Sequence, residues 1–365
     1  MKTKILVIGM ATMIGLAGCS MNEEVSVPKQ DGVIGFSIAT NKAITRSPID
    51  GATAMQSDGF DIWGYRKSDS HQQVGTNNKP VVATYSNTNT AWNLATAAYW
   101  PADASADVDF YAIWPTMHYE IATSIVAGTQ TVKYIRKSAE SDVKDLMYAK
   151  KTTNKTNAAG GKVMLYFKHA LSQVQFKGKT AAVGMEVKVK SLQLCNLNNE
   201  GTFTFPSAET AASSDHGMWG TLSNPETDYM ATINNDVTLN SITNAESLGT
   251  PFLLLPQSFT PWNTTTSAKK SIIDADAANE SYLKLEVYIK QNGEDILGSN
   301  SSYATTYIPL PNPTNDMAFK SGKKYTYTLK FGGGKKEDGD DQFAPIEFDV
   351  DVEPWGDAAE ENLPL

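Results

Sequence analysis

The stretch IEFDVDVEPW, residues 346–355, indicates the kind of structure that this chain builds. Apolar and acidic residues alternate along it without a break, which is the period of a β-strand with one face turned toward a core. The apolar set is Ile346, Phe348, Val350 and Val352, and the acidic set is Glu347, Asp349, Asp351 and Glu353. A strand this regular near the end of the chain either completes the sheet of its own domain or fills a sheet in another molecule.

The same pattern recurs along the rest of the chain. Short runs rich in β-branched and aromatic residues are separated by connections rich in Thr, Asn, Ser and Gly, and long amphipathic helical patterns are missing. This series predicts an all-β protein built from β-sandwiches. The expected strands lie at 31–40, 59–65, 108–115, 162–167, 171–178, 187–194, 282–289 and 323–331. One strand run stops and another starts within 167–171, where we expect the junction of two domains.

Length and charge narrow the class of protein. A chain of 365 residues favours two domains of ordinary size, and 41% hydrophobic residues are enough to form real cores. The 31 Lys and Arg residues stand against 40 Asp and Glu residues, which gives a formal charge of −9 without a basic cluster. Because nucleic-acid affinity depends on neutralising phosphates, we expect no nucleic-acid partner.

The N-terminus has the layout of a bacterial lipoprotein signal. Two lysines precede an apolar core, Ile5 to Ala17, that is too short for a comfortable membrane span, and small residues then lead to Cys19. We expect residues 1–18 to be a signal peptide and 19–31 a lipidated linker, with a diacylglycerol and palmitate as the lipid on Cys19. An ordinary secretory signal with a chance cysteine is the alternative. The following SMNEE resembles the surface-export signal of Bacteroidetes lipoproteins, so the expected location is the surface of the outer membrane.

The sequence contains no pattern typical of an active site or a metal site. The four histidines are scattered, and neither a G-x-S-x-G elbow nor a P-loop is present. The acidic turn EDGDD, 337–341, lacks the ligand spacing of a calcium loop. Cys195 has no intrachain partner once Cys19 is acylated, and we expect it to be a small buried residue. We therefore expect no enzyme activity, no metal and no cofactor.

A series of motifs carries a resemblance to a known family. In order and approximate spacing, the chain resembles the fimbrillin family of Bacteroidales, which comprises the lipoprotein-derived subunits of type V pili and their Mfa-like relatives. The resemblance spans essentially the whole chain behind the lipoprotein signal. The motifs are GFDIWGY (59–65), YWP (99–101), VDFYAIWP (108–115), DLMYAK (145–150), YFKHALSQVQF (166–176), TPFLLLPQSF (250–259), GKKYTYTLKF (322–331) and the near-terminal Trp355.

The resemblance implies a fold and a function. The fold is two tandem transthyretin-like β-sandwich domains with an immunoglobulin-like Greek key, which we place at 32–168 and 169–365. The function is that of a fimbrillin-like structural or adhesive pilus subunit on the outer membrane. Its implied partners are other pilus subunits, in a homopolymer or heteropolymer, and a host or bacterial surface glycan or protein. The alternative is a monomeric surface glycan-binding lipoprotein that feeds an outer-membrane importer.

The tryptophans of the aromatic motifs have two interpretations. Large aromatic residues followed by proline are typical of core strands in a sandwich. Exposed Trp92, Trp100 and Trp114 would instead form a glycan-binding platform. Core packing is favoured, since large aromatic residues are usually substantially buried.

The resemblance also implies a maturation step. In the family, an extracellular arginine-specific protease cuts after an arginine that follows the first strand and discards the lipid-bearing segment. The matching bond here is Arg46–Ser47, and the expected inward residues of the first strand are Ile34, Phe36 and Ile38. The alternative is that Arg46 is a plain exposed residue leading into a turn.

Loss of the first strand would open a groove that needs large apolar residues at every second position. Ile346, Phe348, Val350 and Val352 supply that spacing, and Ile346 and Phe348 repeat the Ile-x-Phe of Ile34 and Phe36. The segment 346–355 is therefore a candidate donor strand. The competing interpretation, a strand of the C-terminal domain itself, stays open.

Overall fold

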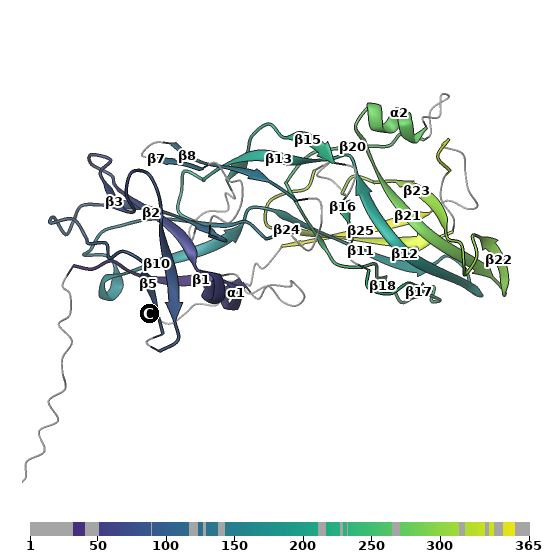
Figure 1. Ribbon diagram of the computed structural model, residues 1–365, viewed down its shortest axis with the longest axis horizontal. Helices are drawn as coiled ribbons and strands as arrows, with labels where there is room; N and C mark the ends of the chain where they lie inside the picture. The colour runs from purple at the N-terminus through teal and green to yellow at the C-terminus, as the bar shows by residue number, and fades with distance from the viewer. Residues whose placement is uncertain are drawn as a thin grey trace, which may run out of the picture. The chain divides into compact units, whose positions relative to one another are not determined.

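Strands dominate the described part of the chain, and its helices are short (Figure 1). All the described residues belong to one compact unit, residues 32–365. The prediction of an all-β protein is confirmed. Among the described residues, no helix has both the length and the apolar character needed to cross a membrane. The computed structural model describes residues 32–40, 51–88, 90–116, 123–126, 129–137, 143–210, 217–226, 229–231, 233–264, 271–313, 318–332, 336–338 and 346–354.

The N-terminal strands form one sheet that closes on itself. The strand order is β3-β2-β4-β5-β1-β10-β9-β6, and β2 pairs additionally with β6, so each strand apart from β3 has a neighbour on both sides. Closure of this kind removes exposed sheet edges. The strands are β1 (Gly35–Thr40), β2 (Phe60–Arg66), β3 (Gln72–Val74), β4 (Val81–Ser86), β5 (Ala91–Leu94), β6 (Val108–Trp114), β9 (Met147–Thr153) and β10 (Lys162–His169).

A core fills the inside of this sheet, because alternate residues of each strand point inward. On β10 the inward residues Val163, Leu165 and Phe167 are buried, whereas Lys162 is exposed on the outer face. The helix α1 (Gly51–Asp58) adds Met55 to this core, and the 3-10 turn η2 (Ala159–Gly161) leads into β10. The expected strands at 59–65, 108–115 and 162–167 coincide with β2, β6 and β10 to within a few residues.

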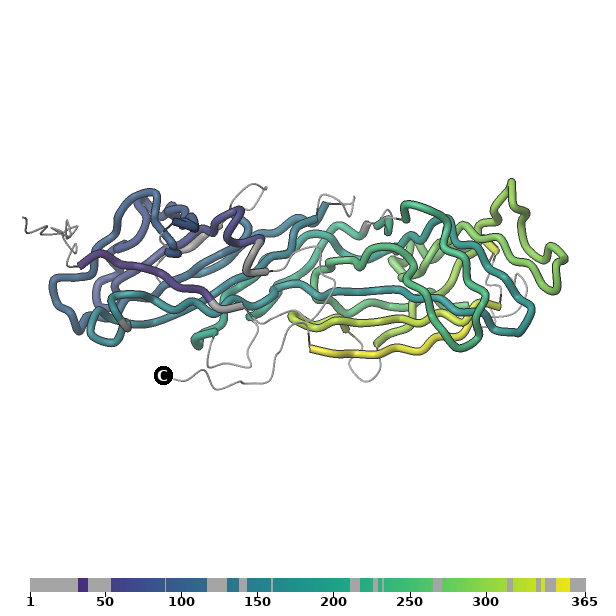
Figure 2. Tube along the Cα trace, turned by 90° about the horizontal axis from the view of Figure 1, so that it is seen from below, coloured from purple at the N-terminus to yellow at the C-terminus, as the bar shows by residue number. Residues whose placement is uncertain are grey.

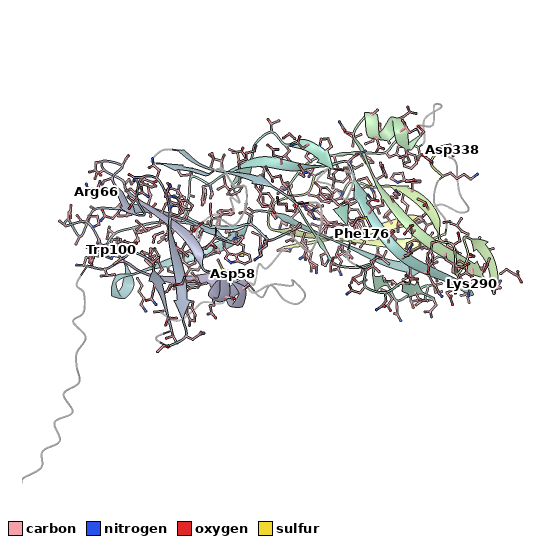
Figure 3. The ribbon with its side chains drawn as sticks, in the orientation of Figure 1. Asp58, Arg66, Trp100, Phe176, Lys290 and Asp338 are labelled. Carbon is pink, nitrogen blue, oxygen red and sulfur yellow. The ribbon has the colours of Figure 1, made fainter. Side chains whose placement is uncertain are left out.

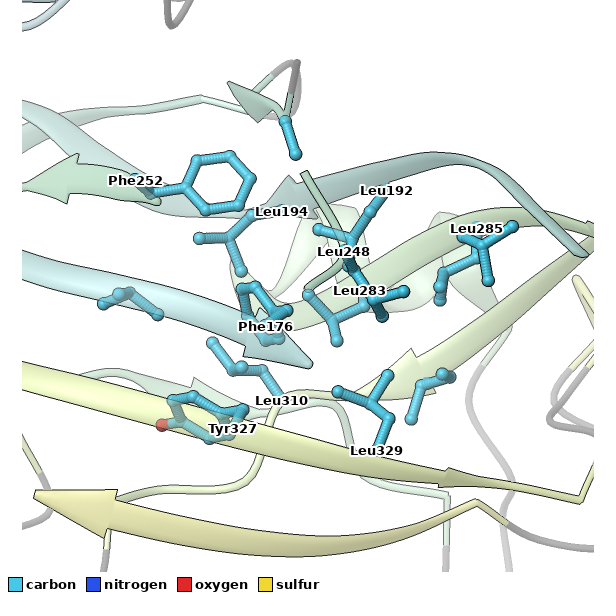
Figure 4. Packing of buried hydrophobic residues seen from close by; sticks show 14 of the residues in the cluster. Phe176, Leu192, Leu194, Leu248, Phe252, Leu283, Leu285, Leu310, Tyr327 and Leu329 are labelled. Carbon is cyan, nitrogen blue, oxygen red and sulfur yellow. The ribbon is translucent and has the colours of Figure 1, made fainter. Parts of the chain in front are cut away.

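Two further sheets enclose the largest core (Figure 4). One has five strands in the order β18-β11-β24-β25, with β19 beside β11; the other has seven in the order β16-β12-β21-β20, with β17 beside β12 and β22 and β23 beside β21. The strands are β11 (Ser172–Thr180), β12 (Met185–Cys195), β16 (Tyr229–Met230), β17 (Val237–Leu239), β18 (Glu246–Ser247), β19 (Phe252–Leu254), β20 (Thr260–Pro261), β21 (Glu280–Gln291), β22 (Glu294–Leu297), β23 (Ala304–Pro309), β24 (Lys323–Phe331) and β25 (Glu347–Pro354).

The helix α2 (Ile272–Ala277) lies beside these sheets and begins at a capping box. The Ser271 hydroxyl accepts a hydrogen bond from the Asp274 amide, while the Asp274 carboxylate accepts one from the Ser271 amide, so two amides of the first turn are satisfied. Ile272 and Ala275 of this helix pack with the buried Cys195, which agrees with the small buried role expected for that residue.

A fourth sheet joins segments from both sides of the expected domain boundary at 168/169. Its strands are β7 (Thr123–Val126), β8 (Thr129–Ile135), β13 (Leu197–Thr204), β14 (Met218–Trp219) and β15 (Ser223–Glu226). β8 pairs with β13 from Thr131↔Thr204 to Ile135↔Glu200. Along the chain, β10 ends at His169 and β11 begins at Ser172, close to the expected boundary. The fourth sheet, in contrast, pairs strands from the two sides of that boundary. The division into 32–168 and 169–365 stays a prediction.

The tryptophans of the aromatic motifs belong to the core. Trp92, Trp100 and Trp114 are 7%, 6% and 0% exposed. Trp100, labelled in Figure 3, belongs to the core cluster of the first sheet. The Trp92 ring lies 4.8 Å from the ring of Phe60. An exposed glycan-binding platform of these three residues is therefore wrong, because their rings fill the space inside the closed sheet.

Candidate functional site

The first strand occupies an interior position in the closed sheet. β1 runs parallel to β10 from Gly35↔Lys162 to Thr40↔Phe167, and its other edge meets β5 at Phe36↔Trp92. The Ile34 amide donates to the Ala98 carbonyl at 2.9 Å, just ahead of the strand. In Figure 2, β1 is the purple tube, at the N-terminal end of the colour scale. β1 is thus the link between β5 and β10.

The inward side chains of this segment are deeply buried. Ile34 and Phe36 are each 2% exposed, and Ile38 is partly buried against the same core. The Phe36 ring meets that of Phe110 edge to face, with 5.8 Å between their centroids. Complete burial of an Ile and a Phe side chain contributes about 1.5–3 kcal/mol each to stability, so an unoccupied groove would expose a costly apolar surface.

The outward face of β1 carries small residues. Gly35 and Ser37 point away from the core, and Gly35 stands opposite Lys162 of β10. An ideal Cβ at position 35 would lie 3.2 Å from the Lys162 Cγ. Any side chain in that position would therefore run along the stem of the lysine. This neighbour could not be predicted from the sequence, since the contact depends on the pairing of β1 with β10.

Several residues of the predicted sites lie outside the described residues. This holds for Cys19, for the Arg46–Ser47 bond and for Trp355 at the end of the candidate donor strand. The structure describes the segment on one side of the bond up to Thr40, and resumes at Gly51 with α1. Lipidation and cleavage stay predictions.

The candidate donor strand lies at the edge of the C-terminal five-stranded sheet. β25 runs antiparallel to β24, from Glu347↔Lys330 to Pro354↔Lys323, and no other described strand pairs with it. Figure 1 draws it in yellow next to β24. In this structure the segment therefore pairs within its own half of the chain. Its role as a donor for a second molecule stays a prediction.

The apolar face of β25 is only partly covered. Ile346, Phe348 and Val350 pack on the outside of the large core, and Val352 is 40% exposed. On the neighbouring β24, the inward Tyr325 and Tyr327 are 0% exposed. β24 thus belongs to the interior of this core, whereas β25 adds a partial cover at the rim.

The acidic face of β25 lies beside lysines of its own sheet. Glu347 pairs with Lys330 at 2.8 Å and Glu353 with Lys324 at 2.7 Å. The hydrogen bond from the Lys330 ammonium holds the pKa of Glu347 below its ordinary value. These pairs are solvent-exposed, so each contributes little to stability, yet together they favour this register of β25 over a slipped one.

Buried polar contacts hold the segments around the fourth sheet. The Arg136 side chain is 1% exposed, donates to the Lys137 carbonyl at 2.6 Å and to the Leu253 carbonyl, and lies 4.3 Å from the centre of the Tyr229 ring. His169 and Asp145 form a buried hydrogen-bonded pair. Contacts between segments so far apart cannot be predicted from the sequence pattern. Neither Arg136 nor the His169–Asp145 pair is part of the ladders that hold β1 and β25.

The described surface includes hollows that neither β1 nor β25 lines. One, of about 410 Å³, is lined by Trp219, Phe319, Lys320 and Lys323 among others; another, of about 360 Å³, lies between 73–81 and 96–98. The Trp219 indole N–H is bonded to the Ala170 carbonyl at 2.8 Å, which fixes this ring in place. Within the described ranges, no group of His, Cys, Asp and Glu residues is placed to hold a metal ion.

Comparison with known protein families gives a match over most of the chain. The model of the family described as fimbrillin-like matches residues 45–355. A fimbrial protein from Bacteroides vulgatus has a TM-score of 0.60 at 18% identity, covering 89% of this chain and 100% of that one, which shows a shared fold. No curated protein sequence matches the chain.

Two other solved structures are similar at lower scores. A protein named for cell adhesion from Bacteroides uniformis has a TM-score of 0.46 at 16% identity, covering 89% of this chain and 99% of that one. The fimbrial anchor protein Mfa2 from Porphyromonas gingivalis has a TM-score of 0.34 at 9% identity, covering 87% and 96%.

Proposed function

Because the chain belongs to the fimbrillin-like family, we propose that it is a structural or adhesive pilus subunit on the bacterial surface. It begins as an outer-membrane lipoprotein, anchored through Cys19. Cleavage at Arg46–Ser47 then removes the first strand, and the segment 346–355 of a second subunit fills the groove. The two halves, 32–168 and 169–365, act as tandem transthyretin-like sandwiches.

The contrasting positions of β1 and β25 carry this proposal. β1 is the first strand along the described chain and lies inside a closed sheet, whereas β25 is the last and lies at an edge. Removal of an interior strand leaves unpaired backbone groups on both of its neighbours, β5 and β10. A new strand can fit between these two neighbours by β-strand addition. Departure of an edge strand opens only one row, on β24.

The side-chain patterns of the two strands match. Ile34, Phe36 and Ile38 line the inner face of the first strand, and Ile346, Phe348 and Val350 repeat the spacing of large apolar groups. Phe348 is only partly buried in its present position. A groove shaped around the Phe36 ring would bury it more completely, so the exchange is favourable in apolar burial.

Replacement of Phe348 by Asp tests this function. The proposal expects the variant to fold and reach the surface, because Phe348 lies at the rim of its own core, but to fail to form polymers, because the groove rejects a buried carboxylate. The measurement is an immunoblot of unheated surface fractions from the bacterium that produces the protein, in which polymers run as a ladder.

Val352→Asp is the matched control on the same strand face, since this side chain is already 40% exposed. The proposal expects a weaker loss of polymer for this control than for Phe348→Asp. It is contradicted if the wild-type protein forms no ladder, or if the Phe348→Asp protein fails to accumulate while the Val352→Asp protein is stable. The second result would assign the strand to its own domain.

A further inference from the structure

We infer that Lys162 of β10 sets the register of the incoming strand by pairing with Glu347 of a second copy of this chain. The inference rests on the proposed strand donation. It concerns the outer face of the groove, which the apolar pattern of the donor does not address. It assigns a recognition role to an exposed lysine that faces a glycine in the uncleaved chain.

A side chain at position 35 would come into direct contact with Lys162. Gly35 presents no side chain to Lys162, and a Cβ in its place would lie 3.2 Å from the Lys162 Cγ, so the flexible lysine stem would shift slightly to accept a side chain. The Lys162 side chain is exposed and makes no ion pair within the described part of the chain. A glutamate at position 35 of the groove would lie along this stem, with its carboxylate in reach of the ammonium group.

The apolar pattern alone leaves the register undecided. A slip by two residues keeps every apolar side chain of the donor on the inner face, so several registers satisfy the core equally in pattern. Superposing Ile346 and Phe348 on Ile34 and Phe36 places Glu347 opposite Lys162, because Gly35 pairs with Lys162 in the ladder of β1 and β10. Glu353 then follows the end of that ladder and comes beside Lys168.

Slipped registers lose one of these charge matches. Moving the donor by two residues in one direction brings Pro345 opposite Lys162, and in the other direction it brings Trp355 opposite Lys168. Of these three registers, only the unslipped one places an acidic residue opposite both lysines. Between them, the donor aspartates face Met164 and Tyr166, which are uncharged and 41% and 37% exposed. The outer face of β10 thus matches the acidic face of the donor at its ends.

The exchange preserves the ion pair of Glu347 while changing its partner. In its own sheet Glu347 pairs with Lys330 at 2.8 Å, and in the groove Lys162 takes the place of Lys330. A cross-strand charge pair changes affinity modestly, whereas like charges directly opposite each other are unfavourable. Reversing the charge of Lys162 should therefore lower the polymer yield by about fivefold at low salt, because a pair is replaced by a repulsion.

A charge swap in the full-length protein tests the register. The variants are Lys162→Glu, Glu347→Lys and the two combined, expressed in the bacterium that produces the protein, with the polymer ladder measured by immunoblot. Lys155→Glu is the matched control, since Lys155 is exposed in a turn and carries the same change in net charge. The expected result is a loss with Lys162→Glu, no loss with the control, and recovery when both groove charges are swapped.

The outcomes separate the register from strand donation itself. A wild-type protein without a ladder would overturn the proposed function together with the inference. A wild-type ladder that Lys162→Glu leaves unchanged would overturn the inference alone. An equal loss with Lys155→Glu, or no recovery in the combined variant, would also overturn it, because the effect would then be one of net charge or folding.

Discussion

Replacement of Phe36 by Ala is expected to destabilise the uncleaved chain strongly. Phe36 is 2% exposed, packs edge to face on Phe110 and stands opposite Trp92 on β5. A Phe-to-Ala change in a closed core costs about 3–5 kcal/mol of unfolding free energy, because the cavity cannot collapse fully. Phe348→Ala is expected to cost only about 1–2 kcal/mol, since Phe348 is partly buried at the rim of its core.

Urea unfolding of the full-length protein, combined with segment-resolved hydrogen exchange, measures both effects. Exchange in β1 and β10 should accelerate in Phe36→Ala, while β24 stays protected. Ser37→Ala is the matched control on the outer face of the same strand and should change the unfolding free energy by less than about 0.5 kcal/mol. If Phe36→Ala lies within about 1 kcal/mol of the wild type, β1 is not the core strand described above. A larger cost for Phe348→Ala than for Phe36→Ala would likewise refute the contrast between the two strands.

Two shorter predictions concern the ends of the chain. Because Lys330 holds the pKa of Glu347 below its ordinary 4.5, the carboxylate helps to dock β25 above that pH, and this contribution is lost as the pH falls through the lowered pKa. Hydrogen exchange in 347–354 should therefore quicken on acidification, and Lys330→Met should remove most of that pH dependence; equal dependence in both proteins would contradict the ion pair as its cause. Arg46→Ala should leave the surface protein uncut and monomeric, with a blocked, acylated N-terminus, and a new N-terminus near Ser47 in this variant would contradict cleavage at Arg46.

Strand positions could be predicted from the sequence because apolar and polar residues alternate along a strand that has one buried and one exposed face. The runs at 187–194 and 323–331 became β12 and β24, whose inward residues are the apolar ones. The same alternation placed Ile34 and Phe36 on a common face. It favoured a core role for the tryptophans, and the packing of Trp92 against Phe60 supplies the reason.

Strand neighbours could not be predicted, because a period of two fixes the face of a residue and not its partner strand. Nothing in the runs themselves places β1 between β5 and β10, closes β2 onto β6 or pairs β8 with β13. The Gly35↔Lys162 contact depends on that arrangement, so Lys162 carried no signal in the sequence. For β25 the sequence left two interpretations open, a strand of its own domain and a donor strand for a second molecule. In this structure β25 pairs with β24 of its own sheet.

If strand donation takes place as proposed, its direction would follow from a difference in burial rather than in charge. Glu347, Asp349 and Glu353 of β25 already have lysine partners in their own sheet, such as Lys330 for Glu347, so exchanging one exposed pair for another changes the free energy little. The apolar face behaves differently. Val352 is 40% exposed and Phe348 is partly covered, whereas the groove that holds Ile34 and Phe36 leaves each of them 2% exposed. Under the proposed strand donation, a donor strand that moves from the rim to this groove would therefore gain apolar burial, while Glu347 would exchange Lys330 for another lysine partner. Under strand donation, cleavage of the first strand supplies the driving force, and the charges choose the register.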